Sequence, residues 1–136
     1  MTVVLDSWAV LCLLQGDGPG AERVERVLAD RPVMSWINLG EVLYILLRRR
    51  GQAEAVEAVR DLRATLSVEL PTESVVRHAA AIKAAHPMAY ADAFAAATTI
   101  AHDGRLWTGD PELLVPGAPW NSLDLRGEGA SDGFPR

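Results

Sequence analysis

The first residues of the chain join a short apolar run to a carboxylate and a helix-like segment. Residues 3–5 predict a strand, Asp6 follows it directly, and residues 7–15 predict a helix that is buried on most sides because apolar residues occur all round it. In an α/β domain ligands bind outside the carboxyl ends of the strands, so Asp6 is a candidate site residue. The alternative is that Asp6 or Ser7 only caps the helix, because a side-chain oxygen there accepts a free backbone N–H.

Strand-like and helix-like segments alternate through the rest of the chain. Periodic apolar residues predict helices at 21–29, 37–50, 52–66 and 72–85, and a run rich in small residues at 90–101 predicts a helix that packs closely against the sheet. Short apolar runs bounded by turn residues predict strands at 32–36, at 67–70, from residue 105 into an acid-bearing loop, and within 120–125. This alternation predicts an α/β fold in which a parallel β-sheet is flanked by α-helices.

The length of 136 residues allows one domain with a substantial core, which we expect to span residues 1–125. Residues 126–136 are rich in Gly, Ser, Asp and Pro and predict a flexible tail. No apolar stretch approaches the roughly 20 residues of a membrane span. The N-terminus also lacks the pattern of a secretory signal, so we expect a cytoplasmic location and no membrane association.

The formal net charge of −5 argues against a protein that binds DNA through a basic surface. It does not exclude an enzyme that acts on nucleic acid, because carboxylates that hold metal ions make such a site acidic until the metals bind. The single cysteine, Cys12, has no second cysteine with which to form a disulfide or a Cys-based metal site.

Three further acids occur near the ends of predicted elements. Asp110 follows a strand and, like Asp6, lies close to a hydroxyl residue, here Thr108. Asp92 lies near the start of the helix 90–101, where the helix dipole alone also favours an acid. Glu41 lies one turn into an earlier helix among apolar residues, where a carboxylate is costly unless it is paired, bound to a cation or turned outward.

In an α/β sheet these positions gather Asp6, Glu41, Asp92 and Asp110 on one rim. Clustered carboxylates repel one another unless they are protonated or neutralised, so such a cluster favours a divalent metal. Oxygen ligands suit Mg²⁺ or Mn²⁺. The chemistry that follows is metal-assisted hydrolysis of phosphodiester bonds, in which the metal activates water and stabilises the leaving oxygen.

Four segments together resemble the PIN-domain ribonucleases, and most closely the VapC-type toxins of bacterial toxin–antitoxin pairs. They are residues 5–7, 38–42, 90–97 and 108–112. The resemblance covers about residues 2–125, and the order and spacing of the four acids are more specific than any single segment. It implies a PIN-like fold and a metal-dependent endoribonuclease with RNA as its substrate.

The resemblance also implies roles for individual residues. Asp6, Glu41 and Asp92 match the family's core metal-binding acids, and Asp110 matches the fourth acid, whose direct contact with metal varies. The implied cofactor is Mg²⁺ or Mn²⁺.

Hydroxyl residues accompany two of these acids. Ser7 and Thr108 match side chains that orient ligands or substrate beside the first and fourth acids. The sequence departs from the family pattern in two places. Trp8 is bulkier than the small polar residue expected there, which would narrow the site or alter the choice of substrate. The helix that carries Asp92 has no Ser or Thr cap before it.

The resemblance implies two protein partners: a cognate VapB-type antitoxin whose C-terminal segment lies across the active site, and a second copy of the chain in a homodimer. Arg48, Arg49 and Arg50 end a predicted helix. They could contact RNA phosphates or antitoxin acids, or they could only complement the negative end of the helix dipole.

Two other functions compete with the ribonuclease. The first is a catalytically weak PIN-like module that retains the acids but acts by binding a protein partner. The second is a phosphoryl-transfer domain of the receiver or haloacid-dehalogenase-like type. That class needs a second Asp close to the first and a supporting Lys, whereas here the next acid is Asp17 and the only lysine is Lys83.

Overall fold

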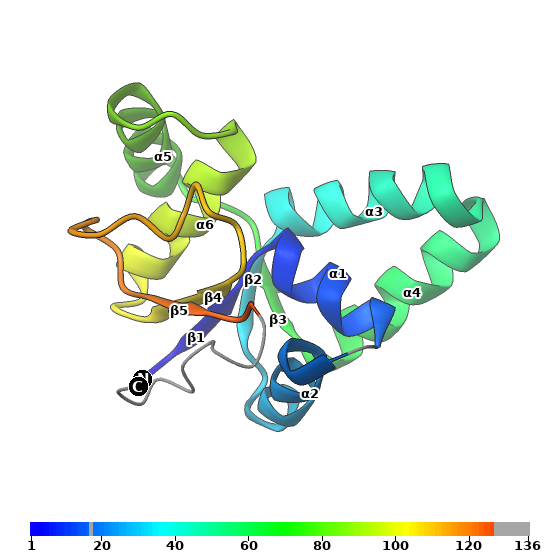
Figure 1. Ribbon diagram of the computed structural model, residues 1–136. Helices are drawn as coiled ribbons and strands as arrows, with labels where there is room; N and C mark the ends of the chain where they lie inside the picture. The colour runs from blue at the N-terminus through cyan, green and yellow to red at the C-terminus, as the bar shows by residue number, and fades with distance from the viewer. Residues whose placement is uncertain (17, 127–136) are drawn as a thin grey trace.

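The computed structural model describes residues 1–16 and 18–126, so most of the predicted tail lies outside the described residues. A five-stranded sheet lies at the centre of the protein. Its strands are β1 (Val3–Leu5), β2 (Val33–Ser35), β3 (Ser67–Glu69), β4 (Arg105–Thr108) and β5 (Ser122–Asp124). The strand order is β3-β2-β1-β4-β5, and every neighbouring pair is parallel (Figure 1). The predicted parallel sheet is therefore confirmed.

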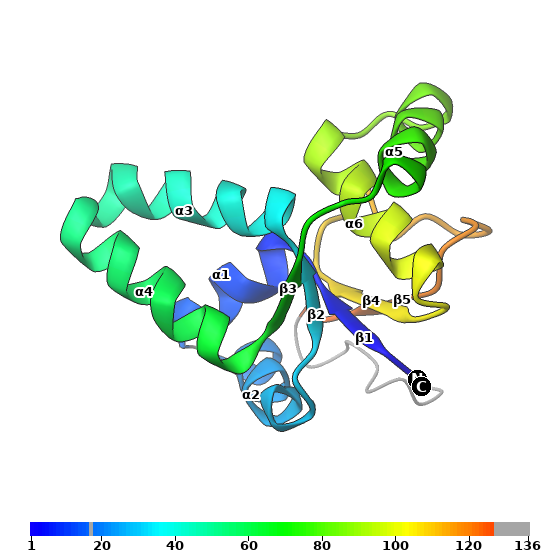
Figure 2. The ribbon, with the colours of Figure 1, turned by 180° about the vertical axis from the view of Figure 1, so that it is seen from behind.

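Helices cover both faces of this sheet. They are α1 (Ser7–Gln15), α2 (Gly18–Val27), α3 (Trp36–Arg50), α4 (Gln52–Thr65), α5 (Glu73–Ala85) and α6 (Tyr90–Ala101). α1 to α4 lie against one face, and α5 and α6 lie against the other (Figures 1 and 2). This is the three-layer α/β/α arrangement that the sequence predicts. None of the helices in the described ranges is long and apolar enough to cross a membrane.

The alternating side chains of β1, β2 and β4 supply both cores. Val4, Val33 and Leu106 pack with α5 and α6, whereas the next residues, Leu5 and Met34, pack with α1 to α4. Successive side chains of a strand point to opposite faces, so a sheet covered on both sides needs apolar residues at every position. This requirement explains why the opening strand is a continuous apolar run.

Several element ends differ from the predictions. The predicted strand 32–36 is too long, because Trp36 begins α3 rather than ending β2. The side chain of Ser35 accepts a hydrogen bond from Ile37 N at 3.2 Å and so caps that helix. The predicted helix 21–29 starts earlier, at Gly18, and ends at Val27, where the short 3₁₀ turn Leu28–Asp30 follows.

The parallel strands place their carboxyl ends at one edge of the sheet. α1 and α3 start there because they follow β1 and β2 directly. α6 runs in the opposite direction to the strands and also begins at this edge (Figures 1 and 2). After α6 ends at Ala101, the chain enters β4 beside the start of β1, where Arg105 N donates to Thr2 O at 2.8 Å. Segments that are distant in the sequence therefore meet at one edge.

Two glycines offer a test of this packing. A Cβ at Gly104 would lie 2.5 Å from the carbonyl oxygen of Thr2, whereas a Cβ at Gly40, on the exposed side of α3, would meet no atom within 4 Å. We expect Gly104→Ala to lower the free energy of unfolding by about 1–3 kcal/mol through overpacking. Gly40→Ala should raise it by about 0.5–1 kcal/mol, because alanine is the better helix former. Urea unfolding of both variants measures the difference, and equal midpoints would contradict this description of the β1–β4 edge.

Candidate functional site

Asp6 lies immediately after β1 and is 2% exposed. Its Oδ1 accepts a hydrogen bond from Ala9 N at 2.9 Å, so Asp6 caps α1. Its Oδ2 accepts a hydrogen bond from the hydroxyl of Thr108, at the end of β4. The capping interpretation is therefore correct but incomplete, because the same carboxylate also joins two strand ends.

Burial raises the pKa of Asp6 from its usual 3.8 to about 7. The hydrogen bonds from Thr108 and Ala9 act in the opposite direction and lower this pKa. The negative charges of Asp110 and Glu41 contribute, after burial, to the increase of this pKa. Both acids are therefore close enough to repel the Asp6 carboxylate.

Glu41 is half-buried and faces α1. The Ser7 hydroxyl donates to the Glu41 carboxylate and also lies 3.2 Å from the carbonyl oxygen of Asn38. The sequence left open whether Glu41 turns outward to solvent or inward; the structure shows that it turns inward. The side chain points toward the start of α1, beside the residue that follows Asp6.

Asp92, Asp110 and Glu112 form the tightest group of acids. One carboxylate oxygen from each lies within 4.8 Å of the others. Asp92 is 8% exposed in the first turn of α6. Burial, the charge of Asp110 and a hydrogen bond with its side chain, in that order, raise the pKa of Asp92 from 3.8 to about 8. Asp6 and Glu41 add to this increase, so the four predicted acids lie on the same side of the molecule.

Short-range hydrogen bonds fix the loop that follows β4. Asp110 N donates to the Thr108 hydroxyl oxygen at 3.0 Å, and Glu112 N donates to Asp110 Oδ1 at 2.9 Å. This turn brings Glu112 back toward Asp92. Glu112 was missed by the sequence analysis, although its position two residues after Asp110 was a usable signal.

We call Asp6, Glu41, Asp92, Asp110 and Glu112 the acid cluster. None of the ion pairs within residues 1–16 and 18–126 includes one of these acids. A buried carboxylate without a cationic partner is unfavourable, as the raised pKa values of two members indicate. The donors are all carboxylate oxygens, which are the ligands that Mg²⁺ and Mn²⁺ prefer. The cluster therefore fits a divalent cation chemically.

The sequence matches the PIN domain family over residues 3–116. The chain belongs to the PIN-domain family. Comparison of the sequence with curated proteins finds no match.

Solved structures share the fold of this PIN domain. VapC20 from Mycobacterium tuberculosis, a sarcin–ricin loop cleaving toxin, is 23% identical, with a TM-score of 0.67 over 82% of this chain and 92% of that chain. VapBC-1 from nontypeable Haemophilus influenzae is 21% identical, with a TM-score of 0.73 over 92% and 98% of the two chains. DNA-bound VapBC from Salmonella typhimurium is 18% identical, with a TM-score of 0.74 over 92% and 98%.

Arg48 and Arg49 of this PIN domain lie apart from the acid cluster. They occupy the exposed last turn of α3, seven and eight residues after Glu41, which places them about 10 Å further along the helix axis. Arg48 stacks over Tyr44, with 5.3 Å between the guanidinium carbon and the ring centroid. Their contact with RNA or an antitoxin stays a prediction.

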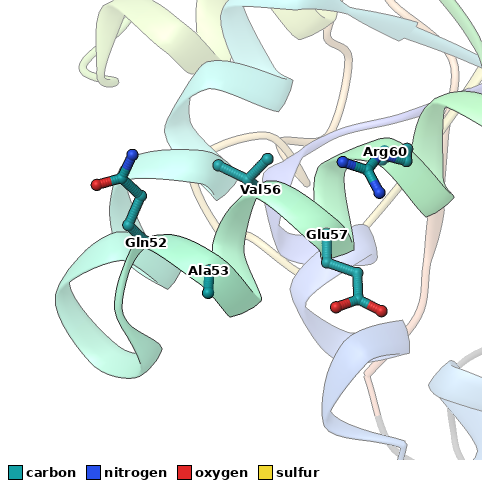
Figure 3. A pocket seen from close by; sticks show the side chains of 5 residues that line it. All are labelled: Gln52, Ala53, Val56, Glu57 and Arg60. Carbon is teal, nitrogen blue, oxygen red and sulfur yellow. The ribbon is translucent and has the colours of Figure 1, made fainter.

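A surface hollow of about 540 Å³ lies along α4 of the PIN domain. Figure 3 shows Val56 and Arg60 on one side of the helix and Glu57 on the other. Val56 and Arg60 also line an adjoining apolar hollow with Trp36 on α3. Neither hollow contains an acid of the cluster, so cavity size does not locate the predicted site.

Trp8, the bulky departure from the family pattern, packs against Gly109 in the loop that carries Asp110. A Cβ added at Gly109 would overlap the indole ring. Trp8 is half-buried. The large side chain is thus accommodated by a glycine on the opposite loop, and the two residues are matched in size.

Double-mutant analysis can test this match. Gly109→Ala should destabilise the protein, because the new methyl group forces the ring or the loop to move, and it should cost less when Trp8 is already Ala. We expect a coupling of about 0.5–3 kcal/mol between the two sites. Urea unfolding of the wild type, both single variants and the double variant provides the four free energies. Strictly additive effects would contradict direct packing of Trp8 on Gly109.

The raised pKa values predict the pH dependence of the metal-free PIN domain. Asp6 and Asp92 titrate near 3.8 when unfolded and near 7 and 8 when folded. Between about pH 4 and pH 8 the folded state therefore binds more protons, and the contribution of these groups to stability falls as the pH rises. Asp92→Asn removes one of them, so the variant should gain thermal stability over the wild type, and the gain should grow from pH 5 to pH 8.

The control for this measurement is Asp61→Asn, which removes one negative charge from an exposed position on α4. Its difference in melting temperature from the wild type should change little with pH. If the stability gain of Asp92→Asn is instead largest at pH 5, the stated electrostatics of the cluster are wrong.

Proposed function

We propose that the protein is a metal-dependent endoribonuclease that acts as the toxin of a type II toxin–antitoxin pair. The observation that carries this proposal is the acid cluster: five carboxylates, of which Asp6 and Asp92 are buried, converge at the carboxyl edge of a PIN-domain sheet, and none of them takes part in an ion pair among the described residues. Such an arrangement is unfavourable without a cation. Metal-dependent phosphodiester hydrolysis is the function that best accounts for the presence of this cluster in a PIN domain.

Several acids of the cluster would bind the ion together. In this proposal Asp6, Glu41, Asp92 and Asp110 bind Mg²⁺ or Mn²⁺, and Glu112 joins Asp92 and Asp110 because its carboxylate lies within the same 4.8 Å group. When bound, the ion would activate water and stabilise negative charge on the leaving oxygen of the phosphodiester.

Hydroxyl residues orient the acids. Thr108 donates to Asp6 and accepts from the backbone N–H of Asp110, so one hydroxyl fixes two acids. Ser7 donates to Glu41 and holds that carboxylate beside the start of α1. Both side chains would thus set the ligand geometry before an ion binds, which reduces the cost of ordering the site.

RNA is the substrate class that we propose, in line with the solved toxin that cleaves the sarcin–ricin loop. The acid cluster repels the phosphates of RNA unless an ion is bound. Arg48 and Arg49, about 10 Å along α3 from Glu41, would then contact phosphates that flank the cleavage site, because guanidinium groups pair well with phosphate.

The proposed partner is a VapB-type antitoxin in the cytoplasm, and the proposed assembly is a homodimer of the domain formed by residues 1–125. Solved structures with this fold include VapBC proteins and a toxin–antitoxin complex. The chain also leaves large apolar side chains exposed on α3 and α4, among them Tyr44, Leu47 and Val56. Such side chains are available for burial by a partner.

Cleavage of a panel of structured RNAs with Mg²⁺ or Mn²⁺ tests the activity. Asp92→Asn should reduce the cleavage rate by about 100-fold or more, because it removes a charged ligand from the centre of the cluster. Asp6→Asn should have a similar effect. Asp61→Asn, the same chemical change on the exposed side of α4, should leave the rate within about twofold of the wild type.

The results also separate the proposal from its rival. If the wild type cleaves no RNA of the panel with either metal, the protein is better described as a PIN-like binding module. If Asp92→Asn cleaves as fast as the wild type, the activity does not come from the acid cluster.

A further inference from the structure

Asn38 is a buried polar residue that the sequence analysis did not select. It lies in the first turn of α3 and is 1% exposed. Its Nδ2 donates to the carbonyl oxygen of Ala91 at 3.0 Å, across 53 residues of sequence. Ala91 directly precedes Asp92, so this hydrogen bond joins α3 to the turn that carries Asp92.

The backbone of Asn38 extends the connection. Its main-chain carbonyl oxygen accepts from the hydroxyl of Ser7 at 3.2 Å, and the same hydroxyl also donates to Glu41. Asn38 and Glu41 are three residues apart on α3 and therefore share a helix face. One residue thus contacts the starts of α1 and α6 and lies one turn from the acid on α3.

The side-chain amide of Asn38 lowers the stability of the fold at this position. Asn38 Oδ1 is enclosed and has no hydrogen-bond partner among the described residues. A buried acceptor without a partner is unfavourable, and an apolar residue of the same size would avoid that penalty. Stability of the core therefore does not explain an asparagine at this position.

The first turn of α6 has no side-chain N-cap, and the nearest other side-chain anchor holds the chain before the cap, where Lys83 Nζ donates to Met88 O at 2.6 Å. Ala89 occupies the N-cap position and makes no side-chain hydrogen bond. Asp92 is also repelled by Asp6, Glu41 and Asp110, which tends to move this turn away from the cluster. The bond from Asn38 opposes that movement.

We propose that Asn38 is a positioning residue, whose hydrogen bond to Ala91 holds Asp92 in register with Glu41 and thereby sets the metal affinity of the acid cluster. This inference rests on the proposed function. Asn38 does not itself bind the ion or the substrate. Its role is to fix the separation of two acids that come from different helices.

Asn38→Leu separates positioning from stability. Leucine has the same number and branching of side-chain heavy atoms as asparagine, lacks the donor, and removes the unpaired acceptor. The metal-free variant should therefore unfold at a temperature equal to or above that of the wild type. Its affinity for Mn²⁺, measured by isothermal titration calorimetry, should be weaker by about 10-fold or more, as for other residues that orient metal ligands. Hydrogen exchange should also be faster at the first turn of α6.

Thr99→Val is the matched control. Thr99 is buried in the same helix as Asp92, and among the described residues its hydroxyl bonds only to Ala95 O, at 2.8 Å and within α6. This variant should bind Mn²⁺ as the wild type does. If Asn38→Leu does not fold, Asn38→Ser, whose side chain is too short to replace the amide, should show the same loss of Mn²⁺ affinity.

Two results would overturn the inference in different ways. If Asn38→Leu binds Mn²⁺ as tightly as the wild type, Asn38 is not a positioning residue and the proposed nuclease stands. If the wild type itself does not bind Mn²⁺, the proposed function fails and this inference fails with it.

Discussion

The parallel pairing of β1 with both β2 and β4 is the constraint on which the rest of the protein depends. It places the ends of three strands side by side, so the residues that follow them must meet. Asp6 follows β1, α3 with Glu41 follows β2, and Asp110 follows β4. An antiparallel partner for β1 would send one of these segments to the opposite edge. The position of the acids is therefore a consequence of backbone topology.

That topology creates an electrostatic cost that the surrounding structure only partly offsets. Hydrogen bonds from Thr108 and Ala9 lower the pKa of Asp6, yet burial still raises it to about 7. Among the described residues no comparable donor lowers the pKa of Asp92, which rises to about 8. Hydrogen bonds fix the surrounding backbone: the Thr108 hydroxyl accepts from Asp110 N, and the amide of Asn38 donates to Ala91 O, next to Asp92. The unfavourable ionisation of Asp6 and Asp92 lowers the stability of the folded protein at this edge of the sheet, a cost that is common at functional sites.

The tight packing around the cluster shows how local sequence choices depend on one another. Trp8 would be too large for its position if residue 109 carried a side chain, and Gly109 leaves the space that the indole ring occupies. Neither residue is informative alone. The pair explains how a departure from the family pattern is compatible with the family's fold.

The sequence alone determined the order of strands and helices, the parallel sheet and the four acids at element ends. These features depend on local periodicity and on residues within a few positions of each other, so they can be read along the chain. The exact ends of helices and strands were harder to predict from the sequence. At Trp36, for example, a single capping hydrogen bond from Ile37 N to Ser35 decided that the residue begins a helix rather than ends a strand. Only the tertiary structure decided that Glu41 faces inward, that Glu112 joins Asp92, and that Asn38 connects two helices. The reason is physical: most of these contacts join residues that lie 20 to 53 positions apart, and no local pattern records which distant partner a side chain will meet.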